Sequence, residues 1–216
     1  MSGLSGRGVG PAPVSRASRC RGWTLIEALV VLAALTILLT LAIPRVDRLA
    51  SGVRTRLAAA EVAGALRLAR MSAIRVERHV AVRFGWDPAR TTGWFRLYVD
   101  GDGDGVRNHD IQRRIDPPLG AARDLRHLGR GVGFGIAAGL RPSDPSGSGR
   151  RLGRLTDPIR FNRSDLASFG PRGTSTPGSI YLSDRRGHLL VVRVFNRTGK
   201  VKTLRYDPRA DRWRPQ

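Results

Sequence analysis

The 216-residue chain has one cysteine, Cys20, and only two lysines, Lys200 and Lys202. A single cysteine excludes an internal disulfide, a zinc site built from cysteine thiolates and a CxxC redox pair. Acidic residues are also scarce, 17 against 38 basic residues, so the formal net charge is +21. Acidic proteins, anionic lipid and nucleic acid are all compatible partners. Because nearly all basic residues are arginine, a general bias in composition explains the charge equally well.

Catalytic and cofactor-binding motifs are missing as well. The four histidines, His79, His109, His127 and His188, are scattered and lack the HExxH spacing of zinc enzymes. The glycine run at 129–135 has neither the GxGxxG spacing of a dinucleotide site nor the lysine of a phosphate-binding loop. We therefore predict that the protein is not an enzyme.

A long apolar run, WTLIEALVVLAALTILLTLAI, occupies residues 23–43 and contains one charged residue, Glu27. An α-helix of this length covers the roughly 30 Å hydrocarbon core of a bilayer. A secretory signal would have a shorter apolar stretch of about 7–15 residues. The pattern therefore predicts a basic leader at 1–22 and a single transmembrane helix at 23–43. A carboxylate inside such a span costs roughly 2.5–3.5 kcal/mol at its centre, which marks Glu27 as a functional residue.

The segment RGWTLIE at 21–27, followed by the apolar span, resembles the N-terminus of type IV pilins and type II secretion pseudopilins. The resemblance implies that a prepilin peptidase cuts after Gly22, removes the leader and methylates the new amine of Trp23. It also implies that Glu27 pairs with the N-terminal amine of a neighbouring subunit during filament assembly. Trp23 departs from the phenylalanine that is usual in the family, although it is still aromatic.

The resemblance further implies a location and partners. The protein would be a single-pass inner (cytoplasmic) membrane protein whose C-terminal domain is periplasmic. Its partners would be the prepilin peptidase, other pilin or pseudopilin subunits, inner membrane lipid and, in a secretion system, secreted cargo.

Beyond the span, residues 44–77 continue a helical pattern with two apolar stripes at three- and four-residue spacing. Two stripes predict a helix wedged between a globular domain and neighbouring subunits. The first consists of Val46, Leu49, Val53, Leu57, Ala60, Leu68 and Met71, and the second of Val62, Leu66, Ala69, Ala73 and Val76.

From residue 78 to 216 the pattern changes to short alternating segments separated by glycine, proline and aspartate, which is typical of strands. We predict an α+β fold, in which the long N-terminal helix packs on an antiparallel β-sheet or a small β-sandwich. The expected strands are 79–84, 93–99, 132–138, 158–161, 179–183, 189–195 and 200–206.

Three C-terminal segments, FGPRG at 169–173, GSIYL at 178–182 and TGKVK at 198–202, look like the last strands of the GspH/FimT class of minor pseudopilins. This second resemblance implies a structural subunit of a type II secretion or type IV pilus-like filament, at its tip or in its initiation. A nucleic-acid-binding minor pilin of a DNA-uptake system is the alternative. Its candidate contacts are Arg193, Arg197, Lys200, Lys202, Arg205, Arg209 and Arg212.

The segment DGDGDG at 100–105 has the spacing of the first half of an EF-hand calcium loop. The twelfth position of the loop carries Ile111 instead of the usual bidentate acid. We expect a divalent cation here, with Ca²⁺ favoured over Mg²⁺, while an aspartate- and glycine-rich turn without an ion is the structural alternative. The candidate ligands are Asp100, Asp102, Asp104, the carbonyl of Val106, Asn108 and Asp110.

Overall fold

The computed structural model describes residues 24–87, 92–129, 131–195 and 198–216. The chain divides into two units, one ending at Ile43 and the other running from Pro44 to Gln216. Helix α1 (Leu25–Val76) contributes to both, and Pro44 lies within it. Gly22 and Trp23 lie outside the described residues, as does Arg197.

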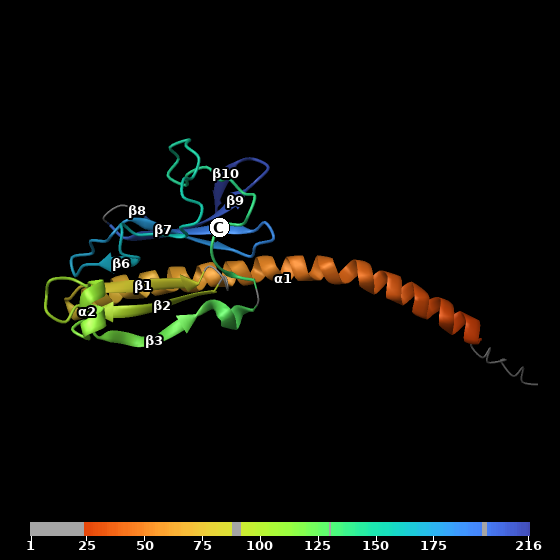
Figure 1. The fold of residues 1–216 in the computed structure, drawn as a ribbon, viewed down its shortest axis with the longest axis horizontal. Helices are drawn as coiled ribbons and strands as arrows, with labels where there is room; N and C mark the ends of the chain where they lie inside the picture. The colour runs from red at the N-terminus through yellow and green to blue at the C-terminus, as the bar shows by residue number, and fades with distance from the viewer. Residues whose placement is uncertain (1–23, 88–91, 130, 196–197) are drawn as a thin grey trace, which may run out of the picture. The chain divides into compact units, whose positions relative to one another are not determined.

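Two antiparallel sheets form the second unit together with α1 (Figure 1). The first has the order β3-β2-β1-β6, from β1 (Val80–Asp87), β2 (Thr92–Val99), β3 (Pro118–Asp124) and β6 (Leu166–Phe169). The second has the order β10-β9-β8-β7-β4, with β5 also paired to β7. Its strands are β4 (Gly133–Phe134), β5 (Ile159–Arg160), β7 (Gly178–Ser183), β8 (Leu189–Phe195), β9 (Lys200–Asp207) and β10 (Arg212–Pro215). The predicted α+β fold is confirmed.

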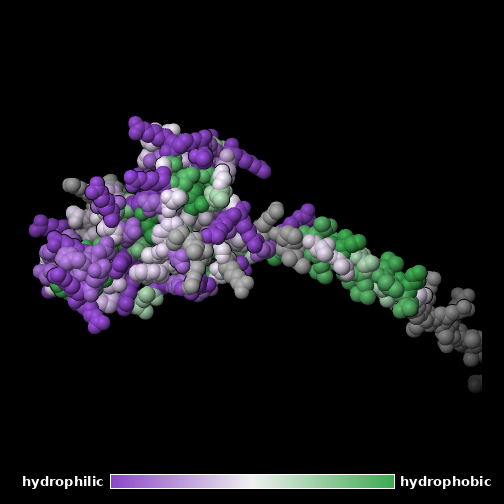
Figure 2. All heavy atoms as spheres, viewed as in Figure 1, coloured by the Kyte–Doolittle hydropathy of each residue, from purple (hydrophilic) through white to green (hydrophobic). Residues whose placement is uncertain are grey.

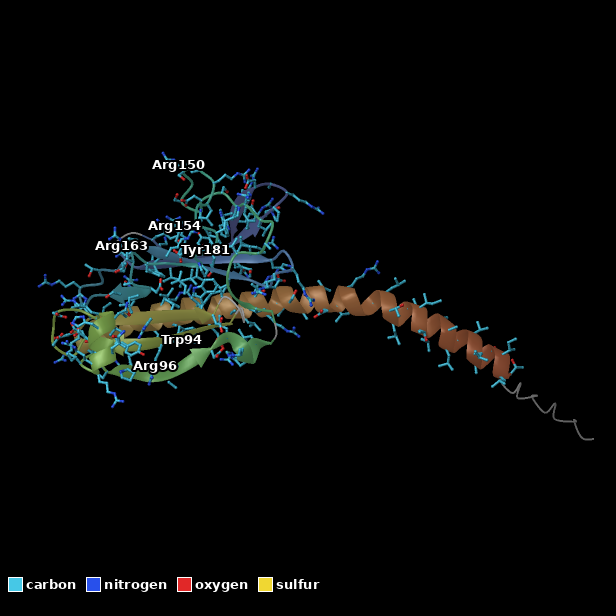
Figure 3. The ribbon with its side chains drawn as sticks, viewed as in Figure 1. Trp94, Arg96, Arg150, Arg154, Arg163 and Tyr181 are labelled. Atoms are coloured by element: carbon cyan, nitrogen blue, oxygen red, sulfur yellow. The ribbon has the colours of Figure 1, made fainter. Side chains whose placement is uncertain are left out.

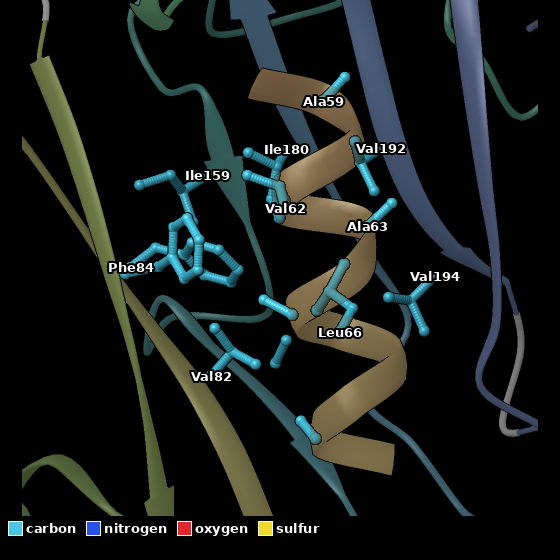
Figure 4. Packing of buried hydrophobic residues seen from close by; sticks show 14 of the residues in the cluster. Ala59, Val62, Ala63, Leu66, Val82, Phe84, Ile159, Ile180, Val192 and Val194 are labelled. Atoms are coloured by element: carbon cyan, nitrogen blue, oxygen red, sulfur yellow. The ribbon is translucent and has the colours of Figure 1, made fainter. Parts of the chain in front are cut away.

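The main core lies where α1 packs between the two sheets (Figure 4). Val62 and Leu66 of the helix are fully buried, with Phe84 of the first sheet and Val192 of the second in the same cluster. Small residues on α1, Ala58, Ala59, Ala63, Ala69 and Ala73, let both sheets approach the helix closely. The rings of Phe84 and Phe161 stack with 5.9 Å between their centroids, which adds to this packing.

Several elements differ from the predicted ones. The strand expected at 132–138 is limited to Gly133–Phe134. Strands β3, β6 and β10, the short helix α2 (Asn108–Arg113) and the 3₁₀ helix η1 (Leu125–Leu128) were not predicted. Most residues of β3 are exposed, so this edge strand lacks the alternation of apolar and polar residues that reveals a half-buried strand.

The outer face of the second sheet carries its own small core. Tyr181, Val191 and Leu204 are buried there beneath Leu152, which belongs to the long segment between β4 and β5. The carbonyl of Ser143 in that segment accepts a hydrogen bond from Trp213 Nε1 over 2.8 Å. Arg150, which also belongs to that segment, points away from the sheet (Figure 3).

Candidate membrane and filament interface

The first turn of α1 is capped by Thr24. Its hydroxyl accepts a hydrogen bond from the backbone N–H of Glu27 over 3.3 Å, and its carbonyl accepts one from Ala28 over 3.2 Å. Glu27 is therefore the third residue of the helix, at the spacing of a capping box. Its carboxylate is exposed and lies at the helix end where the macrodipole favours negative charge. The capped start thus places the one acidic side chain of the span at its N-terminal end.

Between Glu27 and Pro44, helix α1 carries mainly apolar residues on every side. This stretch is strongly apolar and is not buried within the structure. Figure 2 shows apolar side chains covering this part of the helix. A helix that is hydrophobic on every side needs an apolar environment, either lipid or other helices. Its length and composition allow it to span a membrane.

The two stripes on the rest of α1 have opposite environments. Val62, Leu66, Ala69 and Ala73 of the second stripe are fully buried in the main core, whereas Val76, its last member, is 36% exposed. In the first stripe Leu49 is 74% exposed and Met71 is 69% exposed. Val46, Val53, Leu57 and Leu68 of that stripe are also exposed. The second unit therefore keeps an unpartnered apolar face on α1 after its own core has been completed.

A hollow of about 560 Å³ adjoins this face, between α1 and strands β2 and β3. Gly64 and Leu68 line it from the helix, and Leu97 and Leu119 line it from the strands. Apart from its chain neighbours and the adjacent helix backbone, no described atom lies within 4 Å of the place that a Cβ of Gly64 would take, so the hollow has room there for a side chain. Leu68 belongs both to the hollow and to the exposed stripe, which makes the two a continuous apolar surface.

The acidic loop after β2 brings three of its predicted ligands together. One carboxylate oxygen from each of Asp100, Asp102 and Asp104 lies within 4.8 Å of the others. Asp100 is buried, and its two oxygens accept hydrogen bonds from the N–H groups of Gly103, over 2.7 Å, and Gly105, over 3.0 Å. Gly105 has φ +94°, a conformation that favours glycine.

Asp116 closes the same loop. Its fully buried carboxylate accepts one hydrogen bond from the N–H of Gly101 and one from the N–H of Arg107, each over 3.0 Å. Arg107 also forms an ion pair with Asp104. Asp116 therefore ties Gly101 to Arg107 across the loop. Of the remaining predicted ligands, Val106 lies just before α2, and Asn108 and Asp110 lie at its start.

Electrostatics within the loop disfavour the ionised form of Asp104. Desolvation raises the pKa of Asp104, and the negative charges of Asp102 and Asp110 raise it further, against the lowering effect of Arg107. The pKa of Asp104 is thus raised despite its ion pair with Arg107.

The basic residues proposed for nucleic acid do not share one face of the second sheet. In the β8–β9 register Arg193 is opposite Lys202, and Phe195 is opposite Lys200. This face also carries Val191 and Leu204 of the outer core. The guanidinium of Arg193 lies 4.9 Å from the centroid of the Phe195 ring.

Arg205 is opposite Leu190, which faces the main core, so it lies on the other side of the sheet. Arg212 pairs with Asp207 and shares that side, because residues two apart on a strand point the same way. Arg209 lies in the turn between β9 and β10. The described members of the set are therefore split between two faces and a turn, which does not favour a single phosphate-binding patch.

One polar cluster was not visible in the sequence. Asp184, at the end of β7, accepts a hydrogen bond from Ser51 Oγ of α1 over 2.8 Å, and the same oxygen lies 2.6 Å from His188 Nδ1. A serine nucleophile needs the imidazole between it and the carboxylate. Here the carboxylate lies between the serine and the histidine, so the cluster ties α1 to the sheet and is not a catalytic triad.

Comparison with known proteins identifies one family. The sequence model described as "Type II transport protein GspH" matches residues 58–199, about two thirds of the chain. The match begins in the buried half of α1 and runs to the turn between β8 and β9. No curated protein and no solved structure matches the chain.

Proposed function

Because the chain belongs to the GspH family of type II transport proteins, we propose that it is a processed minor pseudopilin that assembles with other pilin-like subunits into a short periplasmic filament. Membership of this family and an N-terminal helix able to span a bilayer agree with a membrane-anchored structural subunit. This role would include removal of the leader, pairing of subunits through Glu27 and a defined position in the filament.

The observation that carries the proposal is the division of α1 into two faces. Leu66 faces the protein's own core, whereas Leu57 and Met71 are exposed on the opposite side. A soluble protein rarely leaves such a stripe uncovered. Neighbouring pilin-like helices would cover it, and the hollow beside Leu68 would accept a side chain from one of them.

Glu27 would set the axial position of each subunit. Processing after Gly22 creates a free ammonium on Trp23, in surroundings of low dielectric constant where an unpaired charge is costly. The exposed carboxylate of Glu27 in a neighbouring subunit is a suitable partner. Pairing would neutralise both charges and favour one stagger between helices over the others.

The orientation follows from the processing reaction. The leader would lie on the cytoplasmic side of the inner membrane, where the prepilin peptidase acts on it, and the unit from Pro44 onward would be periplasmic. A position at or near the filament tip, with a role in initiation or in contacting secreted cargo, rests on the likeness to minor subunits.

Intact-mass analysis of the chain expressed with and without a prepilin peptidase tests the processing step. We expect loss of residues 1–22 and a gain of about 14 Da for one methyl group only when the peptidase is present. Replacing Gly22 by a bulky residue, as in Gly22→Val, should leave the chain uncut. An unprocessed wild-type chain in the presence of the peptidase would overturn the proposal.

The pairing step needs a separate variant. Glu27→Ala should still be cut and methylated but should not be recovered with partner subunits after crosslinking. Glu77→Gln removes an acidic charge at an exposed position after α1 and serves as the matched control. Normal assembly of Glu27→Ala would contradict the pairing role while leaving the processing result intact.

A further inference from the structure

The loop at 100–116 has no part in the filament role. It follows β2, passes through α2 and leads into β3. Five of the chain's 17 acidic residues lie in it: Asp100, Asp102, Asp104, Asp110 and Asp116. The same loop holds three arginines, Arg107, Arg113 and Arg114, so its formal charge is −2 in a protein with a net charge of +21.

Hydrogen bonding already accounts for part of the cluster. Asp116 has a backbone donor on each of its oxygens, and Asp100 accepts from Gly103 and Gly105. Asp104 is paired with Arg107. These contacts explain how the loop folds. Among the residues that the structure describes, Asp102 has no ion pair with a basic side chain, and Asp110 has one only with His109.

Two buried oxygens give an independent indication of a ligand. Asp110 is 2% exposed, and its Oδ2 has no hydrogen-bond partner among the described residues, although its Oδ1 lies 2.9 Å from His109 Nε2. Oδ1 of Asn108 is likewise buried without a donor, while its amide nitrogen donates to the carbonyl of Ser164 over 2.9 Å. Orphaned buried oxygens of this kind are rare unless an ion or a water satisfies them.

Asp110 lies in the same loop, six residues after Asp104, but outside the group of three carboxylates that lie within 4.8 Å of one another. The side chains of Val106 and Ile111 are buried together with Tyr98, so the loop is anchored by an apolar contact beside the acids. Because Ile111 belongs to this anchor, Asp110 is left as the acid nearest the twelfth position.

We propose that this loop binds one Ca²⁺ ion through carboxylate oxygens of Asp100, Asp102, Asp104 and Asp110, with the carbonyl of Val106 and Asn108 Oδ1 completing an all-oxygen shell. Calcium accepts six to eight oxygen ligands in flexible geometry, whereas magnesium demands a near-ideal octahedron and keeps its waters. A glycine-rich loop that offers oxygens at alternate positions fits the larger ion.

Bound Ca²⁺ would fix the position of the loop relative to the neighbouring strands. Arg78 donates from Nη1 to the carbonyls of Asp100 and Gly101, each over 3.3 Å, so the loop is connected to the segment that joins α1 to β1. Neutralising the carboxylates would hold β2, α2 and this segment together. Because the usual bidentate acid is replaced by Asp110, the affinity should be that of extracellular calcium modules, with Kd roughly 10⁻⁴–10⁻³ M.

Calcium titration of the full chain in detergent micelles tests the site. At ten times the dissociation constant, Ca²⁺ should raise the midpoint of thermal unfolding by about 3–6 °C, and EGTA should reverse the rise. Mg²⁺ at the same concentration should have a smaller effect. No rise with Ca²⁺, or an equal rise with Mg²⁺, would overturn the proposal.

Variants assign the ligands. Asp102→Asn changes an exposed ligand and should weaken Ca²⁺ binding at least tenfold in isothermal titration calorimetry. Asp110→Asn should weaken it similarly, but that residue is buried and the variant could be destabilised. Glu77→Gln, a change of the same charge outside the loop, should bind as the wild type does. An unchanged Ca²⁺ affinity in Asp102→Asn would refute the site. These binding measurements do not depend on processing or on filament assembly.

Discussion

Ser51 Oγ on helix α1 donates a hydrogen bond of 2.8 Å to Asp184 Oδ2 at the end of strand β7, across a separation of 133 residues in sequence. Both side chains are almost completely buried. Gly52, the next residue, has the ring of His188 close to the place that a Cβ would take. The contact fixes the helix against the second sheet just before the buried stripe of α1 begins. The first prediction therefore concerns this hydrogen bond.

Ser51→Ala should destabilise the protein by about 1–3 kcal/mol, because it removes a donor from a buried carboxylate. The free energy of unfolding in urea, measured in detergent micelles, would show it. Ser148→Ala, in an exposed loop, should change the free energy by less than about 0.5 kcal/mol and is the control. Equal stability of the two variants would mean that Ser51 does not anchor α1.

The same carboxylate predicts an acid limit to stability. Burial by itself would raise the pKa of Asp184, but hydrogen bonds from His188, from the Arg186 N–H and from Ser51 outweigh it and hold the pKa below its usual value. A depressed pKa in the folded state contributes stability at pH values above the unfolded pKa of about 3.9. That contribution is lost as the pH falls through the folded pKa.

Thermal unfolding between pH 2 and pH 6 checks this expectation. The midpoint temperature of the wild-type chain should decrease as the pH is lowered below about 4. Part of that decrease should be absent in Asp184→Asn, whose side chain does not ionise. An identical pH profile in the two proteins would contradict the assignment to Asp184.

His127 gives a pH effect of the opposite sign. The carbonyl of Asp124 and the carboxylate of Glu61 raise the pKa of His127, and Glu61 Oε1 lies 2.9 Å from its Nε2. The protonated imidazole therefore stabilises the fold below the unfolded pKa of about 6.5, and this contribution is lost as the pH rises through the folded pKa.

An NMR titration of His127 measures that effect directly. Glu61→Gln should lower the pKa of His127, because the imidazolium loses its anionic partner. Glu77→Gln should leave the titration of His127 unchanged, since this glutamate lies at the end of α1 and not beside the histidine. A pKa that is the same in all three proteins would exclude the ion pair.

The two stripes of α1 should respond differently to the same substitution. Leu66→Ala removes a fully buried side chain from the main core and should cost about 2–5 kcal/mol of stability. Leu57→Ala, at a position that is 50% exposed, should cost less than about 1 kcal/mol but should reduce crosslinking to partner subunits. Denaturant unfolding and crosslinking of both variants separate the two roles. Full assembly of Leu57→Ala would argue against the exposed stripe as an interface.

The sequence alone predicted the elements in which periodicity and burial agree. Val62 and Leu66 recur at helical spacing and are buried, and β1 and β2 are short runs rich in β-branched and aromatic residues that supply Val82, Phe84 and Phe95 to the core. β10 could not be predicted in this way because it is a short edge strand with mostly exposed side chains, and α2 is too short to show a helical period. Glu27 was identifiable because a charge inside an apolar run is costly wherever the chain folds.

Only the tertiary structure decided which distant groups meet. The spacing of Asp100, Asp102 and Asp104 is local, so it predicted their proximity, whereas the orphaned oxygen of Asp110 depends on how α2 packs against the loop. The register of β8 with β9 divided the C-terminal arginines between two faces. Ser51 and Asp184 meet through the packing of a helix on a sheet. Such contacts form only when the whole chain packs, because residues far apart in sequence come together through the combined packing of many side chains.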